Sequence, residues 1–144
     1  MAKSLWSLPD VSNLRTPVRI LREQAAALTD ETKGILVGTV ATESMAGETI
    51  RFHLKNDACQ IEQASIRPAF GIYLDIRVPS LNDYRYRVLT YFQPLELYPG
   101  YIRAADDERE IRDEAQFIEA LKSILSSSRV KGVLRALMAQ AADA

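Results

Sequence analysis

The most reactive side chains of this sequence are those of His53, its only histidine, and Cys59, its only cysteine. A single histidine excludes, within one chain, both a metal site built on two histidines and a His-x-x-x-His motif. The two residues are close enough in sequence to form a nucleophilic dyad, but a dyad also needs a group that orients it, and none is evident. We therefore expect a structural Cys59 and an exposed His53.

Other catalytic patterns are missing as well. The sequence contains no G-x-S-x-G elbow, no P-loop and no G-x-G-x-x-G motif. Two acidic pairs, Asp106–Asp107 and Asp30–Glu31, lie in a charged linker and at a helix end, which are typical solvated positions. A metal-dependent or glycosidic mechanism needs carboxylates that converge, and these pairs do not. We expect a protein that is not an enzyme and that uses no cofactor and no metal.

The remaining candidate residues lie in residues 70–94, which we expect to form one long β-hairpin. Two runs alternate with the period of a strand, and residues 79–83 between them have turn composition. The apolar sets are Phe70, Ile72, Leu74, Ile76 and Val78 in the first run, and Tyr84, Tyr86, Val88, Thr90 and Phe92 in the second. A continuous apolar face requires Ile76 opposite Tyr86 and Leu74 opposite Val88.

This register also predicts which residues are cross-strand neighbours on the other face of the hairpin. Asp75 lies opposite Arg87, a cross-strand pair that contributes roughly 0.2–1 kcal/mol to stability, and Tyr91 covers Gly71. The face is charged near the turn and apolar near the base, so we expect another element to cover the base and to leave the tip free. The candidate partner-binding residues are Tyr73, Asp75, Arg77, Tyr84, Arg85, Arg87 and Tyr91.

The N-terminal part of the chain divides into an arm and the start of a domain. Residues 1–15 are apolar but broken by Pro9, so we expect an extended arm that lies on the body or, as the alternative, on a second subunit. Residues 16–144 are expected to form a single α+β domain. Thr16 and Pro17 have the N-cap and N1 chemistry that begins a helix.

The expected order of elements places this domain in the α+β class, with an antiparallel meander of four to five strands. Residues 35–42 and 49–55 predict a second hairpin with an interior strand, residues 56–68 a connection, and residues 95–103 an edge strand with a bend. Residues 106–110 predict an exposed acidic segment. Asp113 and the serines at 126–128 predict the starts of two C-terminal helices that pack on the sheet.

The composition, with 47% hydrophobic and 26% charged residues, is that of an ordinary globular protein. A formal net charge of −1 provides no global field that attracts nucleic acid or an anionic membrane. The single cysteine suits a reducing compartment. No apolar run approaches the roughly 20 residues that span a bilayer, and residues 1–10 lack the apolar stretch of a signal peptide. We therefore expect a cytoplasmic protein that does not enter the membrane.

These observations favour a small binding or adaptor module that acts through protein–protein contacts, with a homodimer as one form, because tyrosine and arginine are enriched at interface hot spots. Two alternatives stay open. In the first, the hairpin face is only a solvated surface. In the second, the protein binds nucleic acid through the hairpin arginines together with Arg15, Arg19 and Arg22, which lie at helical spacing.

Overall fold

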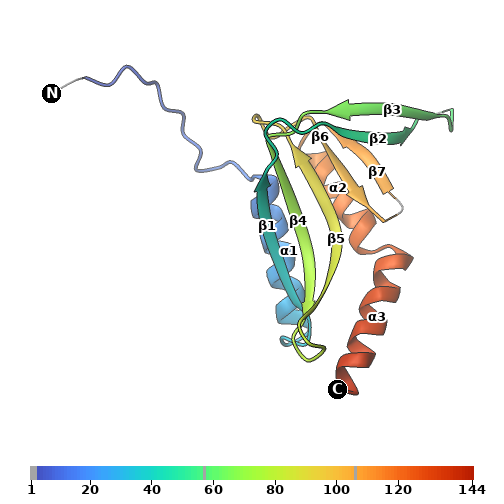
Figure 1. Cartoon of the computed structure of the whole chain (residues 1–144). Coiled ribbons are helices and arrows are strands. Elements are labelled where there is room, and N and C mark those ends of the chain that lie inside the picture. The colour runs from blue at the N-terminus through green and yellow to red at the C-terminus, as the bar shows by residue number, and fades with distance from the viewer. Residues whose placement is uncertain (1–2, 57, 106) are drawn as a thin grey trace.

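The computed structural model describes residues 3–56, 58–105 and 107–144, and within them the chain forms three helices and seven strands (Figure 1). The strands are β1 (Val37–Ser44), β2 (Ile50–Lys55), β3 (Ile61–Ile66), β4 (Phe70–Val78), β5 (Tyr84–Gln93), β6 (Gly100–Ala104) and β7 (Asp107–Ile111). The helices are α1 (Pro17–Glu31), α2 (Glu114–Leu125) and α3 (Ser128–Ala142). The predicted α+β class is confirmed.

In the part of the chain that the structure describes, five strands form one antiparallel sheet in the order β1-β4-β5-β6-β7, while β2 pairs with β3. The predicted hairpin between residues 35–42 and 49–55 is therefore wrong, because β1 pairs with β4 at the edge of the sheet. Residues 61–66, which we expected to be a connection, are the partner strand of β2. They form a strand because Ala64 and Ile66 pack in one apolar cluster with Phe52.

The central hairpin of β4 and β5 follows the predicted register only near its turn. Ile76 lies opposite Tyr86 and Asp75 opposite Arg87, as expected. A bulge then leaves Val88 without a partner, so that Leu89 rather than Val88 lies opposite Leu74. Since side chains alternate between faces, this single extra residue turns over the rest of β5 relative to the prediction.

The helices cover one face of the main sheet, here called the inner face, and the opposite face is called the outer face (Figure 1). The inner face carries the main core, which includes Leu74, Leu89, Tyr91 and Ile102 together with Phe117 of α2. The predicted helix starts are confirmed: Thr16, Asp113 and Ser127 each accept a hydrogen bond from a backbone N–H of the first turn. Among the described residues, no helix is long and apolar enough to cross a membrane.

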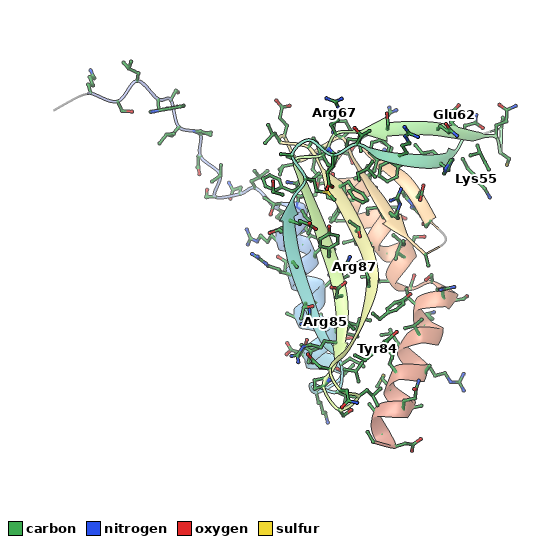
Figure 2. The ribbon with its side chains drawn as sticks, in the orientation of Figure 1. Lys55, Glu62, Arg67, Tyr84, Arg85 and Arg87 are labelled. Carbon is green, nitrogen blue, oxygen red and sulfur yellow. The ribbon has the colours of Figure 1, made fainter. Side chains whose placement is uncertain are left out.

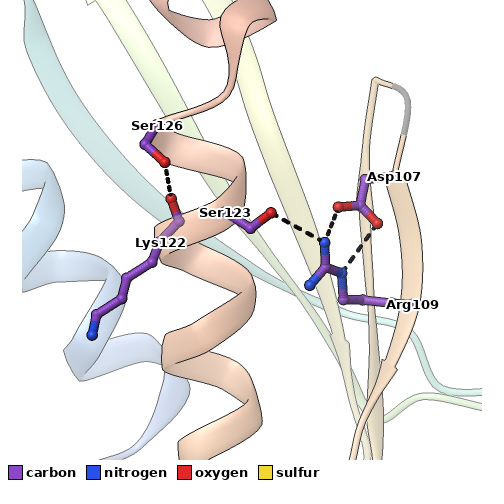
Figure 3. A network of polar contacts seen from close by, with 5 residues as sticks. All are labelled: Asp107, Arg109, Lys122, Ser123 and Ser126. Atoms are coloured by element: carbon purple, nitrogen blue, oxygen red, sulfur yellow. Dashed lines mark hydrogen bonds and ion pairs between the residues drawn. The ribbon is translucent and has the colours of Figure 1, made fainter.

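The strands β6 and β7 complete the sheet beyond β5. The edge strand expected at residues 95–103 begins only at Gly100, and it lies inside the sheet because β7 pairs with its other side. The predicted acidic segment 106–110 contributes β7 instead, apart from Asp106, which lies outside the described residues. Arg109 of β7 donates to Asp107 and to Ser123 Oγ at 3.4 Å, which ties β7 to α2 (Figure 3).

Candidate functional site

The candidate site is the half of the outer face that lies near the turn of the central hairpin, here called the tip half. Strands β1, β4 and β5 position its side chains. Odd-numbered residues of β4 project outward because the even-numbered Ile72, Leu74, Ile76 and Val78 are buried beneath the helices. Arg85 and Arg87 belong to β5 (Figure 2). They project on the same face, where the strand register places them opposite Arg77 and Asp75.

Arg87 is the centre of this surface. Its Nε donates to Asp75 Oδ1 at 3.0 Å, and one terminal nitrogen lies 3.4 Å from Asp75 Oδ2. Its guanidinium carbon lies 4.0 Å from the centroid of the Tyr73 ring, which is cation–π distance. The Tyr73 hydroxyl in turn donates to Glu43 Oε2 of β1 at 2.5 Å. We call Glu43, Tyr73, Asp75 and Arg87 the outer-face cluster.

The protonation of the cluster follows from these contacts. The hydrogen bond to Glu43, together with partial burial, raises the pKa of Tyr73 to about 12, so its hydroxyl is a donor at neutral pH. The hydrogen bond to Asp75 raises the pKa of Arg87 above its ordinary value, so its guanidinium stays charged. The Asp75 side chain is 10% exposed and that of Arg87 is 54% exposed, so the arginine closes off a nearly buried carboxylate while presenting its own edge to solvent.

The tip of the hairpin adds positive charge. Arg77 donates to Asp83 Oδ1 at 2.5 Å. Arg85 lies directly opposite Arg77 and is exposed, and within the described ranges it makes no ion pair. Tyr84 is half-exposed, but it lies opposite the buried Val78 and so projects from the inner face rather than the outer one. It therefore does not adjoin the outer-face cluster.

Tyr91, the last residue of the predicted surface, is fully buried on the inner face, so its predicted position over Gly71 is wrong. The bulge is the reason, since it shifts Tyr91 opposite Ile72 and places Phe92 opposite Gly71. The Tyr91 ring packs edge-on against Phe117 at 5.0 Å. Its hydroxyl donates to the backbone carbonyl oxygen of residue 97 at 2.6 Å.

The base of the outer face is covered, as the sequence predicted, and the covering element is the β2–β3 hairpin. Phe52 of β2 is fully buried and stacks on Tyr101 at 4.5 Å and edge-on against Phe92 at 5.4 Å. Figure 1 shows this hairpin crossing one end of the main sheet and projecting beyond it. The tip half is thus the part of the outer face that remains open.

Arg103 of β6 fixes the β2–β3 hairpin in place and was missed by the sequence reasoning. It forms an ion pair with Glu108 at 2.9 Å, donates to the backbone oxygen of Arg51 at 2.5 Å and lies 4.8 Å from the Phe52 ring centroid. Glu108 also accepts from the backbone N–H of His53 at 2.9 Å. The only sequence signal was an arginine inside an otherwise apolar strand pattern.

The arginines of the nucleic-acid alternative lie in and beside α1, on the helical side of the sheet. Arg15 pairs with Glu23 at 2.7 Å, and Arg19 lies 3.6 Å from the same carboxylate. Arg22 is exposed on the helix. The hairpin arginines project from the opposite side of the sheet, so the two sets do not form one continuous surface.

The reactive residues of the sequence lie outside the tip half. His53 is an exposed residue of β2, and Cys59 is an exposed free thiol in the turn that follows β2. A hollow beside His53 is lined by Arg51, Phe52, His53, Gln63, Ala64 and Ser65, a set without a carboxylate. The structure arranges no three His, Cys, Asp or Glu side chains as a metal site anywhere in residues 3–56, 58–105 and 107–144.

Comparison with known proteins gives no match to a protein-family model, to a curated protein or to a solved structure. The function must therefore be argued from the surface itself. That surface combines three arginines, a tyrosine and the carboxylates that pair with them.

Proposed function

We propose that the protein is a small non-enzymatic binding module that acts through protein–protein contacts, and that its partner docks on the tip half of the outer face. The observation that carries the proposal is the way Arg87 is held. Two hydrogen bonds and the Tyr73 ring fix it while 54% of its side chain stays exposed. An arginine that is ordered before binding loses less conformational entropy on docking, and arginine and tyrosine are typical hot-spot residues.

The charges on this surface indicate the chemistry of the partner. Arg85 has no ion pair within the described ranges, whereas Arg77 and Arg87 are each paired with an aspartate. A partner that offers a carboxylate opposite Arg85 gains a charge-assisted contact without breaking the internal pairs. The exposed thiol of Cys59 fits a reducing compartment, so we place this interaction in the cytoplasm.

The proposal is tested by photo-cross-linking in the native cells of the protein. A photo-reactive amino acid replaces Ala41, an exposed residue opposite Tyr73 on the outer face, in one variant and Lys131, an exposed lysine of α3, in the control, so that Arg85 stays in place. We expect a distinct protein to be captured at position 41 only, and Arg85→Glu to abolish its co-purification while Lys131→Glu does not. The same captured proteins at both positions, or none at position 41, would refute the proposal.

Nucleic-acid binding is the competing outcome of the same work. A nucleic-acid complex would carry the ultraviolet absorbance of its ligand through purification and would lose it steeply as salt is raised. That result, together with loss of binding in both Arg85→Glu and Arg22→Glu, would replace the protein-contact proposal.

A further inference from the structure

The arm that precedes α1 exposes large apolar side chains to solvent. Leu5 is 97% exposed and Trp6 is 84% exposed. The exposed apolar residues of this arm are Leu5, Trp6, Leu8, Val11 and Leu14. Figure 1 shows residues 3–16 running away from the body of the protein. A turn closed by a hydrogen bond from Leu14 N–H to the Val11 carbonyl at 3.1 Å separates the outer part of the arm from the root of α1.

An apolar groove lies between α1 on one side and α2 with α3 on the other. Two adjoining hollows of about 210 Å³ and 630 Å³ form it, and both are lined by Gln24 and Leu125. The floor is Leu74, Ile76 and Val88 of the sheet. The walls are apolar, with Leu28 of α1 and Leu134 of α3 among them. We call this hollow the interhelix groove.

The two ends of the groove carry opposite charges. Arg15 and Lys122 line one end, here called the mouth, and Glu31 lines the other. Lys122 and Glu31 make no ion pair within the described parts of the chain. Figure 3 shows that the Lys122 side chain leaves α2 on the side away from the Arg109 network. A ligand for the groove is therefore apolar, with an anionic group at the mouth and a cationic group at the far end.

The arm is such a ligand, because it is apolar with a charged residue at each end, and its length matches that of the groove. The apolar stretch of the arm lies between Lys3 and Asp10. Seven residues of extended chain separate these charges, a span of about 23 Å at ~3.3 Å per residue. The groove follows α1, whose 15 residues rise about 22 Å. Asp10 at the mouth would meet Lys122 while Lys3 meets Glu31. Because side chains of an extended segment alternate, Trp6 and Leu8 would face the apolar floor together and Leu5 would lie on the other side.

The arm of the same copy does not fit in this register. Arg15 lines the mouth, so an arm that doubled back would place Asp10 five residues, about 16 Å, into the groove. A carboxylate there would lie unpaired among apolar side chains, which is unfavourable. The arm of a second copy has no such constraint, because its root is not attached to this groove.

We propose that the protein forms a two-fold dimer in which the arm of each copy lies in the interhelix groove of the other. This exchange uses the inner side of the molecule, so it is independent of the proposed contacts on the outer face. Either proposal can fail alone: arm or groove variants test the dimer, and Arg85 variants test the outer face.

The sequence itself supplies a reporter, because Trp6 is the only tryptophan. Its fluorescence reports the environment of the arm directly. We expect the emission of a solvated indole in dilute solution and a shift to the blue as the concentration rises, in parallel with the change from monomer to dimer seen by light scattering. A monomer at all concentrations, or a dimer whose tryptophan stays solvated, would refute the exchange.

A matched pair of variants separates the arm from general surface hydrophobicity. Leu8→Asp places a charge over the apolar floor and should weaken the dimer about thirty-fold or more, as loss of a hot-spot residue does. Leu95→Asp makes the same change at an equally exposed leucine on the β5–β6 loop and should leave the dimer unchanged. Equal dimerisation of both variants would contradict the proposal.

Disulfide trapping separates exchange from docking within one copy. In a Cys59→Ser background, the proposed register brings Ser7 of one copy beside Gln24 of the other. We expect a Ser7→Cys copy mixed with a tagged Gln24→Cys copy to form a disulfide in trans, whereas a tagged Glu96→Cys copy does not. An arm that doubled back would instead bring Ser12 beside Gln24 of its own copy, because Ser12 is three residues from Arg15 at the mouth. If a Ser12→Cys, Gln24→Cys double variant forms a disulfide within a monomer and the mixed copies form none, the arm docks in its own groove and the exchange is refuted.

Discussion

Arg87→Ala is the change that measures how firmly the outer-face cluster is held. The sequence alone assigns the Asp75–Arg87 pair roughly 0.2–1 kcal/mol, the value of a solvated cross-strand pair. The structure raises this value because the Asp75 side chain is only 10% exposed and, among the described residues, has no ion-pair partner other than Arg87. Removing Arg87 therefore leaves a nearly buried carboxylate unpaired.

The magnitude follows from the burial of each partner. A buried group that loses its partner costs about 1–3 kcal/mol, and more if it is charged. Water can enter once the half-exposed arginine is gone, which favours the middle of that range. We expect Arg87→Ala to lower the free energy of unfolding by about 2 kcal/mol, or roughly 7 °C in Tm for a domain of this size. Asp75→Ala should cost less than about 1 kcal/mol, because it leaves behind an exposed, solvated guanidinium.

The assay is denaturant unfolding followed by far-UV circular dichroism, since Trp6 lies in the exposed arm and does not report on the core. Arg85→Ala is the matched control on the same face and should lie within about 0.5 kcal/mol of the parent. The double variant of Asp75 and Arg87 should be more stable than Arg87→Ala alone, because it contains no unpaired carboxylate. If Arg87→Ala and Arg85→Ala have equal stability, the cluster is a solvated surface and the reasoning is wrong.

Five further changes test other parts of the structure, each by thermal unfolding. Tyr98→Phe should raise Tm, because it removes a buried hydroxyl that has no hydrogen-bond partner. Tyr91→Phe should lower Tm through a loss of about 1 kcal/mol in the free energy of unfolding, because the Tyr91 hydroxyl donates a hydrogen bond. The raised pKa of Tyr73 means that folding favours its protonated hydroxyl. The contribution of this preference to the free energy of unfolding is complete below pH 10 and is lost as the pH rises towards 12. Tyr73→Phe should therefore lose less stability between pH 10 and pH 12 than the parent protein does. Gly38→Ala should cost roughly 1–3 kcal/mol, because its Cβ would lie 2.5 Å from a backbone oxygen of α1. Gly132→Ala, at an open helical position, should instead add about 0.5–1 kcal/mol.

The parts of the fold that depend on local chemistry were predictable from the sequence. Thr16 and Asp113 begin helices through contacts with residues three positions away. The Asp75–Arg87 pair was predicted because it lies near a short turn, where the register depends on few residues. Local preferences and the observed structure agree at all of these positions.

The parts that depend on long-range pairing were not predictable. Val88 and Leu89 are adjacent apolar residues that both fit the core. Nothing in the alternation of the sequence shows that Val88, rather than Leu89, is the extra residue of the bulge. The hydrogen bond from Tyr73 to Glu43 requires β1 to pair with β4, across the intervening β2–β3 hairpin. The sequence thus predicted the arginine and aspartate of the outer-face cluster but not the glutamate that orders its tyrosine.

The position of the β2–β3 hairpin determines which part of the outer face stays open. Phe52 occupies the apolar base of the outer face, so it removes the surface that would otherwise favour unspecific apolar contacts. What remains open is polar and, except at Arg85, internally paired among the described residues, so in the proposed function it would select a partner by charge and shape. The interhelix groove on the other side is apolar and lined by helices, so in the proposed exchange it would take up an apolar segment. Since the two surfaces lie on opposite sides of one sheet, a dimer joined through the arms would present two outer faces, each free to bind a partner.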